Sequence, residues 1–177
     1  IRLTRMSKTM SPSEVVARLQ QYFMVMQRLI HEYDGNINKC AGDDIMAFWS
    51  APQRSAEDEG DAVRAALQMQ TKLWALNLQL EAEGQRALSM GVGLNTGEFV
   101  AGNIGIEDNV EFALIGDSVN LAAQIVKLAA RYQVFIADAT WQPIRHLAGA
   151  VQLPPRVVHD ASTSMALYSI RSIQHRT

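Results

Sequence analysis

The chain has 177 residues, of which 48% are hydrophobic and 19% are charged, and its formal net charge is −2 at pH 7. This composition is typical of one ordinary globular domain. The small net charge gives no reason to expect a nucleic-acid partner. The sequence contains no uncharged apolar run of about 18 residues, which is the length needed to span a membrane. Cys40 is the only cysteine, which excludes a disulfide framework and a cysteine-rich zinc site and favours a reducing, cytoplasmic compartment.

The first predicted elements are a helix and a hairpin. Residues 11–14, Ser-Pro-Ser-Glu, indicate a helix start with a serine cap, proline at the first helical position and glutamate three residues after the cap. Apolar residues then recur at helical spacing until Gly35. Short apolar strands follow at residues 36–41 and 44–49, and Gly42-Asp43 between them predicts a tight turn.

The rest of the chain alternates strands with helices. Residues 51–61 are typical of a surface loop, and residues 62–80 of a second amphipathic helix that Gly84 closes. A strand at residues 88–94 is predicted to turn at Thr96-Gly97 and return at residues 99–101. The later predicted elements are a strand at 110–114, a helix capped by Ser118 that ends near Arg131, a strand at 134–137, a short helix near 140–147 and strands near 151–158 and 165–170. Hairpins mixed with helices predict an α+β sandwich with helices on one face of a sheet.

Two adjacent acids, Asp43 and Asp44, lie at the turn of the first hairpin. Aspartate favours tight turns without any ligand, so the hairpin alone leaves open whether these acids shape the turn or hold a cation. Neighbouring strand residues point to opposite faces, so at most one of the two can face a site.

Two further segments bear on ligand binding. The run GVGLNTG, residues 91–97, has the wrong spacing for a dinucleotide loop and precedes a predicted hairpin, so its glycines are interpreted as turn and close-packing positions. The run GDSVN, residues 116–120, opens a helix whose free N–H groups and dipole suit a phosphate. An acidic hairpin tip and a phosphate-suited helix start together suggest metal–polyphosphate chemistry.

Four blocks of the sequence resemble, in the right order, the catalytic domain of the class III nucleotidyl cyclases. They are LTRMSKTMSPSEVVARLQQYF, DGNINKCAGDDIMAFWSAP, GVGLNTGEFVAGNIG and FALIGDSVNLAAQ. The resemblance implies that residues 1–177 form a single domain with a ferredoxin-like α+β fold of the βαββαβ type, in which helices pack on a mostly antiparallel sheet. It also implies a dimer with composite active sites that converts ATP or GTP to the 3′,5′-cyclic nucleotide and pyrophosphate.

The resemblance further implies a metal site that includes Asp43. In the family, two carboxylates of one subunit hold two Mg²⁺ or Mn²⁺ ions, which activate the attacking ribose hydroxyl and bind the triphosphate. Asp43 matches one of these carboxylates, whereas Asp44 falls on a variable position. The other acid of the family precedes a segment that residues 1–4 resemble. Because the chain starts at Ile1 instead of Met, we expect it to be a piece of a longer protein in which that acid lies upstream.

Lys39 and Ala113 match the two positions that read the base. Lys39 corresponds to the lysine that accompanies adenine specificity, although a lysine at an exposed strand end is also common without any ligand. Ala113 offers no hydrogen bond. Lys39 would therefore have to select adenine alone or with backbone groups.

Three residues match the positions that handle the ribose and the phosphates. Asn120 corresponds to a ribose-orienting asparagine, and Gln124, one helical turn later, replaces an arginine that stabilises the transition state. His159 falls where a phosphate-binding lysine usually lies, and histidine is mostly neutral at pH 7. Loss of such an arginine typically lowers the rate by about 10³–10⁵, or about 4–7 kcal/mol. A symmetric homodimer repeats every substitution in both sites, so we expect a slow enzyme.

The sequence leaves several functions open. The first is an adenylyl cyclase domain, working on ATP as a homodimer or as a heterodimer with an intact cyclase subunit. The second is a degenerate domain that binds nucleotide or dimerises and regulates a fused or partner protein, which Ala113, Gln124 and His159 favour. The third is a guanylyl cyclase or a diguanylate cyclase. The diguanylate cyclase is included because AGDDI resembles the Gly-Gly-Asp-Glu-Phe turn of the diguanylate cyclase family. The two later blocks fit class III better.

Overall fold

The computed structural model describes residues 10–50, 53–106, 109–157 and 164–175. The chain divides into two compact units, Ile1–Met90 and Gly91–Thr177. Helices combine with mainly antiparallel strands, which confirms the α+β class. Whether residues 1–177 behave as a single domain stays a prediction. In the described part of the chain, no helix is long and apolar enough to cross a membrane.

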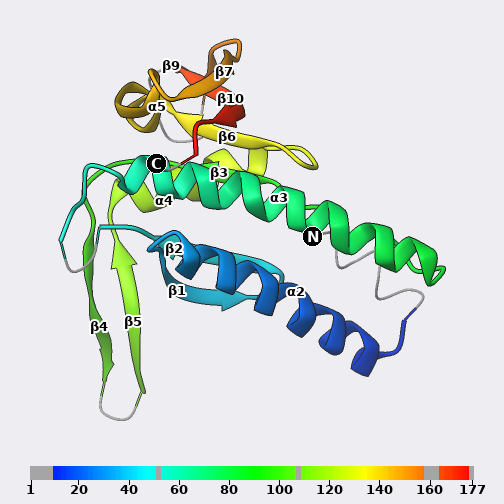
Figure 1. Cartoon of the computed structure of the whole chain (residues 1–177). Coiled ribbons are helices and arrows are strands. Elements are labelled where there is room, and N and C mark those ends of the chain that lie inside the picture. The colour runs from blue at the N-terminus through cyan, green and yellow to red at the C-terminus, as the bar shows by residue number, and fades with distance from the viewer. Residues whose placement is uncertain (1–9, 51–52, 107–108, 158–163, 176–177) are drawn as a thin grey trace. The chain divides into compact units, whose positions relative to one another are not determined.

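The first unit consists of two helices and one hairpin (Figure 1). Its elements are α2 (Pro12–Glu32), β1 (Asn36–Ala41), β2 (Asp44–Phe48) and α3 (Asp58–Ala82). The predicted capping box at the start of α2 is confirmed, because the Ser11 hydroxyl accepts from the Glu14 N–H at 3.4 Å and the Glu14 carboxylate accepts from the Ser11 N–H at 2.7 Å. Such a cap typically stabilises a helix by about 1 kcal/mol.

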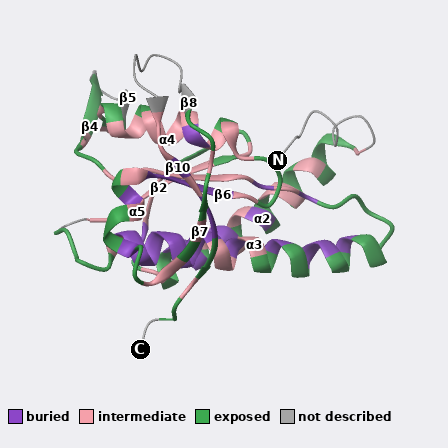
Figure 2. Cartoon of the chain, turned by 90° about the horizontal axis from the view of Figure 1, so that it is seen from above, coloured by how far each residue is buried: buried purple, intermediate pink, exposed green. Residues whose placement is uncertain are grey.

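Helix α3 begins earlier than predicted. Residues 58–61 were expected in a loop, but the helix starts at Asp58, whose carboxylate accepts hydrogen bonds from the Ser50 hydroxyl at 2.6 Å and the Ser55 N–H at 2.8 Å. Acidic residues in a first turn are favoured by the helix dipole, so the charges that indicated a loop instead stabilise the helix start. Residues 59–66 are all buried, whereas the later turns are buried on one side only (Figure 2).

The second unit is built on a four-stranded sheet in the order β3-β6-β10-β7. Its elements are β3 (Val92–Leu94), β4 (Val100–Ile106), β5 (Asn109–Ile115), α4 (Asp117–Leu128), β6 (Val134–Ala137), α5 (Asp138–Ile144), β7 (Ala148–Gln152), β8 (Arg156–Val157), β9 (Ser164–Met165) and β10 (Leu167–Ile173). Within this sheet β3 and β6 are parallel and the other two pairings are antiparallel. The sheet is thus mostly antiparallel, as predicted.

The predicted hairpin at Thr96-Gly97 is wrong. Strand β3 pairs in parallel with β6, and β4 pairs instead with β5 in a separate two-stranded sheet. The regular strand is also shorter than expected, since Leu88 and Met90 are buried but lie before it. Apolar alternation reports which side of a strand is buried and does not report its neighbour in the sheet.

Helix α4 packs its apolar side into the core of the second unit. Ile125 is fully buried against Phe135, Ala137 and Leu167, with Leu121 and Leu128 beside this cluster. The expected cap is wrong: Gly116 occupies the N-cap position and no side chain caps the helix. Helix α4 ends at Leu128, three residues before Arg131.

Candidate functional site

The β1–β2 hairpin carries the predicted metal-binding residue at its turn. Ala41 pairs with Asp44, so Gly42 and Asp43 form a two-residue turn. Gly42 has φ +61°, and Asp43 is not among the described non-glycine residues with positive φ, which is the pattern of a type II′ turn. Asp43 is half-buried and Asp44 is exposed, so the two acids have different surroundings.

Lys39 projects from the side of the hairpin that faces away from α2. Its neighbour Cys40 accepts a hydrogen bond at Sγ from Nε2 of Gln27 in α2, at 3.5 Å. Successive strand residues point to opposite faces, so Lys39, which is exposed and pairs with Met46, lies on the other face. The ammonium group is therefore carried on the accessible face of β1.

Tyr22 of α2 is buried within electrostatic reach of the hairpin turn. Its hydroxyl donates to Met90 Sδ at 3.2 Å. Burial raises the pKa of Tyr22, and the negative charges of Asp43 and Asp44 raise it further. The phenol therefore stays protonated near neutral pH and remains a hydrogen-bond donor close to the two acids.

Helix α4 carries Asn120 and Gln124 one turn apart. Residues four apart lie on the same face of a helix, so these two amides share one side of α4 while Ile125 enters the core. Asn120 is exposed and Gln124 is half-buried. Both can donate neutral hydrogen bonds, and neither brings a positive charge.

Strand β3 packs closely against the second half of α4, and the segment after β3 holds the start of the helix. A Cβ on Gly93 would lie 2.4 Å from the backbone nitrogen of Val126, so only glycine permits this approach. Asn95 Nδ2 donates to the Ser118 carbonyl at 3.1 Å, and the Ser118 hydroxyl donates to the Glu98 carbonyl at 2.6 Å. The interpretation of this glycine-rich run as a close-packing segment is confirmed at Gly93.

Ala113 and His159 complete the set of predicted residues. Ala113 is half-buried on β5 and pairs with Gly102 of β4, whose ideal Cβ would meet no atom within 4 Å. The pair Ala113–Gly102 therefore offers a methyl group and no polar side chain. His159 lies outside the described residues, so its role stays a prediction.

The predicted site residues are divided between the two units. Lys39 and Asp43 belong to the first unit, and Ala113, Asn120 and Gln124 belong to the second. Among the residues that the structure describes, no group of three or more His, Cys, Asp or Glu could hold a metal ion. Mg²⁺ is nevertheless often bound through one or two carboxylates together with substrate phosphates and water, so a half-buried aspartate at a turn fits one such ligand.

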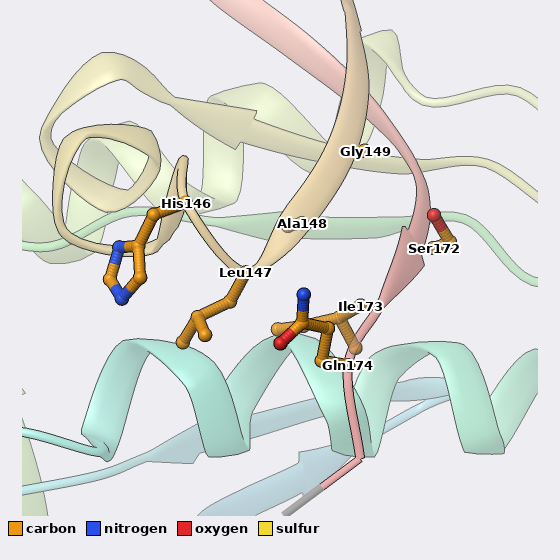
Figure 3. Close-up of a pocket in the computed structure, with 7 residues that line it drawn as sticks. All are labelled: His146, Leu147, Ala148, Gly149, Ser172, Ile173 and Gln174. Atoms are coloured by element: carbon orange, nitrogen blue, oxygen red, sulfur yellow. The ribbon is translucent and has the colours of Figure 1, made fainter.

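An open pocket of about 420 Å³ lies elsewhere in the second unit, between the start of β7 and the end of β10 (Figure 3). Its lining residues are His146, Leu147, Ala148, Gly149, Ser172, Ile173 and Gln174. None of the predicted site residues that the structure describes lines this pocket.

Asn38, which lies beside Lys39, was not among the predicted site residues. Ile37 pairs with Ala47 and Lys39 pairs with Met46, so Asn38 is an extra residue in β1. The sequence signal for it was slight: an apolar Ile37 and a charged Lys39 two positions apart, which a regular strand places on one face.

Sequence comparison finds relatives among nucleotide cyclases. The profile of the adenylate and guanylate cyclase catalytic domain family matches residues 2–165. "Adenylate cyclase 1" of Rhizobium meliloti (strain 1021) is 33% identical over 169 residues, covering 94% of this chain and 25% of the relative. "Adenylate cyclase" of Anabaena cylindrica is 34% identical over 136 residues, covering 73% of this chain and 26% of the relative. The chain thus spans about a quarter of the length of these curated relatives.

Solved structures of cyclases share the fold. The guanylyl cyclase Cya2 matches with a TM-score of 0.86 and 30% identity, covering 97% of this chain and 87% of that chain. The adenylyl cyclase CyaB from P. aeruginosa matches with a TM-score of 0.88 and 24% identity, covering 97% and 89%. These matches confirm the predicted cyclase-type α+β fold.

Proposed function

The chain belongs to the family of adenylate and guanylate cyclase catalytic domains, and we propose that it is a slow adenylyl cyclase that converts ATP to 3′,5′-cyclic AMP and pyrophosphate. The observation that carries the proposal is the β1–β2 hairpin, which presents Lys39 on its accessible face and Asp43 at its turn. Similarity alone does not choose the base, because the relatives include adenylate cyclases and a guanylyl cyclase. Lys39 favours adenine, because it matches the family lysine that accompanies adenine specificity and its ammonium can donate to the acceptor nitrogen N1 of adenine.

Asp43 is the proposed protein ligand of the catalytic metal. Its carboxylate would share Mg²⁺ or Mn²⁺ with triphosphate oxygens and water. When bound, such an ion lowers the pKa of the ribose 3′-hydroxyl and neutralises charge on the triphosphate. Two ions per site are expected, and within the described residues Asp43 belongs to no group of three or more potential metal ligands, so we assign further ligands to substrate phosphates, water and a carboxylate upstream of Ile1.

Asn120 and Gln124 are the proposed ribose and phosphate contacts. In the reaction, the 3′-oxygen forms a bond to the α-phosphorus, the bond to pyrophosphate breaks, and the 3′-hydroxyl proton leaves to solvent. Asn120, exposed near the start of α4, can orient the ribose by hydrogen bonding. Gln124 can donate to a phosphate oxygen but stabilises the growing charge less than a cation would. These substitutions are the reason for proposing a slow reaction.

The β4–β5 sheet is the proposed contact with a second copy of the chain. Val100, Ile104 and Ile115 are 71%, 50% and 55% exposed. Their register partners and the strand period place them on one face of the hairpin, the same face as Ala113. Glu111 pairs with Ile104 on the same face, so this surface is mainly apolar with one charged residue, and exposed surfaces of this kind are typical of interaction sites. A copy bound there would bring the base-reading position of one subunit to the interface, and an intact cyclase subunit could take the place of the identical partner.

A regulatory module is the second candidate function. The observations that favour it are Ala113, which has no polar group, and Gln124, which has no charge. In this alternative the domain binds nucleotide, or dimerises, and acts on a fused or partner protein without forming product.

Product analysis tests the proposal. The purified chain would be incubated at several protein concentrations with Mn²⁺ and either ATP or GTP, and cyclic nucleotides would be identified by mass spectrometry. We expect cyclic AMP, with a specific activity that rises with protein concentration because the active species is a dimer. Cyclic GMP as the main product would refute the assigned base. Nucleotide binding without any cyclic product would favour the regulatory module.

A further inference from the structure

Strand β1 is interrupted by a β-bulge directly before Lys39. Ile37 pairs with Ala47 and Lys39 pairs with Met46, so two residues of β1, Asn38 and Lys39, oppose one residue of β2. Bulges re-aim side chains and are frequent beside functional sites. The side chain of Asn38 therefore need not follow the alternation of a regular strand, and its contacts decide its direction.

The contacts of Asn38 place it on the same face as Lys39. In a regular strand the two side chains would point to opposite faces. Here Asn38 Nδ2 donates to Met46 Sδ at 3.3 Å, and Met46 is the cross-strand partner of Lys39. Directly opposed residues of an antiparallel pair project from the same face. The bulge thus sets the amide of Asn38 beside Lys39, on the face of the hairpin that carries the ammonium group.

The amide of Asn38 has unused hydrogen-bonding capacity. Its nitrogen donates to a thioether sulfur, which is a weak acceptor. Its Oδ1 is covered from solvent and has no hydrogen-bond partner among the described residues. A buried acceptor without a donor is costly, so the native state gains when the amide turns to meet a donor.

We propose that Asn38 is a second purine-reading residue, whose Oδ1 accepts a hydrogen bond from the exocyclic amino group of adenine while Lys39 donates to the adjacent ring nitrogen N1. This inference rests on the proposed function, because it requires a purine nucleotide at Lys39. In the chain without nucleotide, Oδ1 of Asn38 is covered from solvent, so the amide must turn outward when the base binds. That rotation breaks only the weak contact with Met46. Asn38 then supplies the acceptor that Ala113 lacks.

The pair of residues fits adenine better than guanine. An amide can present either its oxygen or its nitrogen to a base, so Asn38 alone would discriminate poorly. Lys39 only donates. N1 of adenine is an acceptor, whereas N1 of guanine carries a hydrogen and would oppose the ammonium donor. Selectivity therefore comes from the two neighbouring side chains acting together.

Binding of a base analogue tests the contact directly. Equilibrium binding of ATP and of purine riboside triphosphate, which lacks the exocyclic amino group, would be measured by calorimetry for the whole chain and for Asn38→Leu. Leucine resembles asparagine in size and cannot accept a hydrogen bond. We expect Asn38→Leu to weaken ATP binding by about 3- to 10-fold and to change binding of the analogue by less than about twofold.

Two further variants serve as controls. Asn38→Asp keeps an acceptor and is expected to retain the preference for ATP over the analogue. Asn36→Leu changes the other asparagine of β1, which pairs with Phe48 farther from the turn, and is expected to leave both affinities unchanged. Circular dichroism would establish that each variant is folded.

The outcomes separate the inference from the proposed function. An equal loss for both nucleotides, or no loss for either, would mean that Asn38 serves only the hairpin, and the inference would be overturned. If the wild-type chain forms cyclic AMP while Asn38→Leu leaves the ATP preference intact, the proposed function stands and the inference alone fails. If the folded wild-type chain binds neither nucleotide, the proposed function fails and the inference fails with it.

Discussion

Replacing Gly93 with alanine tests whether β3 sets the position of α4. An ideal Cβ on Gly93 would lie 2.4 Å from the backbone nitrogen of Val126, 2.8 Å from its Cα and 3.0 Å from the carbonyl oxygen of Ala122. All three are backbone atoms of α4, so rotation of a side chain cannot relieve the clash. The helix must move away from the strand.

The size of the effect follows from these distances. Non-bonded carbon contacts are optimal near about 3.5–4.0 Å, so α4 must shift by about 1 Å beside Gly93. Overpacking of this kind typically costs about 1–3 kcal/mol, which lowers Tm by about 2–12 °C for a chain of this length. Asn120 and Gln124 move with the helix. A misplacement of about 1 Å can lower the rate of a positioned reaction by about 10²-fold.

The assay is calorimetric unfolding together with cyclic nucleotide formation. Gly102→Ala is the matched control for Tm, because its Cβ would meet no atom within 4 Å. We expect this control to be neutral, or stabilising by up to about 1 kcal/mol through lower entropy of the unfolded chain. An unchanged Tm in Gly93→Ala would refute the close approach of β3 and α4. An equal drop of Tm in both variants would assign the effect to the replacement of glycine in general.

Four further substitutions address the hairpin turn and the site. Asp43→Ala is expected to abolish cyclic nucleotide formation with a Tm close to wild type, and substantial activity of the folded variant would refute the metal assignment. Gln124→Arg is expected to raise kcat at least about 10-fold in steady-state kinetics, because it restores a positive charge. This gain is part of the roughly 10³–10⁵-fold increase in kcat that such an arginine supplies. No gain would mean that another group already fills this role or that the metals are not bound. Gly42→Ala is expected to lower the free energy of unfolding in urea by about 1–2 kcal/mol, because φ is +61° there and no atom lies within 4 Å of the added Cβ; an unchanged midpoint would contradict the turn type. Ala113→Asp is expected to raise kcat/KM for ATP relative to GTP by about 3- to 10-fold by adding an acceptor, and an unchanged ratio would place this position away from the base.

Elements whose determinants lie within a few residues were predictable. The cap of α2 was predicted because serine, proline and glutamate act on the same first turn, and the structure contains the expected capping box. The strands of the first hairpin were predicted to within one residue because Gly42 at φ +61° occupies the turn. Strand β6, residues 134–137, was predicted at its observed bounds because every residue of it is buried and apolar.

Elements whose determinants are distant in sequence were not predictable. Strand β3 pairs with β6, about forty residues later, and no local pattern distinguishes that neighbour from β4. Ser118 was expected to cap α4 because serine favours that position, but its hydroxyl donates instead to the Glu98 carbonyl, twenty residues earlier in the chain. In both cases a contact between distant segments overrode a local preference.

The candidate site shows the same division between local and distant causes. The pair Asp43 and Asp44 could be noticed because acids after a turn glycine are a local feature, and the resemblance to the cyclase family then selected Asp43. Asn38 could not be noticed in this way, because its direction depends on how β1 pairs with β2. In a regular strand Ile37 and Lys39 would share a face, yet Ile37 is half-buried and Lys39 is exposed. The bulge at Asn38 resolves this conflict by letting the apolar and charged residues take opposite faces, and it turns the asparagine toward Lys39 as a consequence. A charged residue and an apolar residue two positions apart, next to a defined hairpin turn, are therefore the sequence pattern by which such a bulge can be sought in other chains.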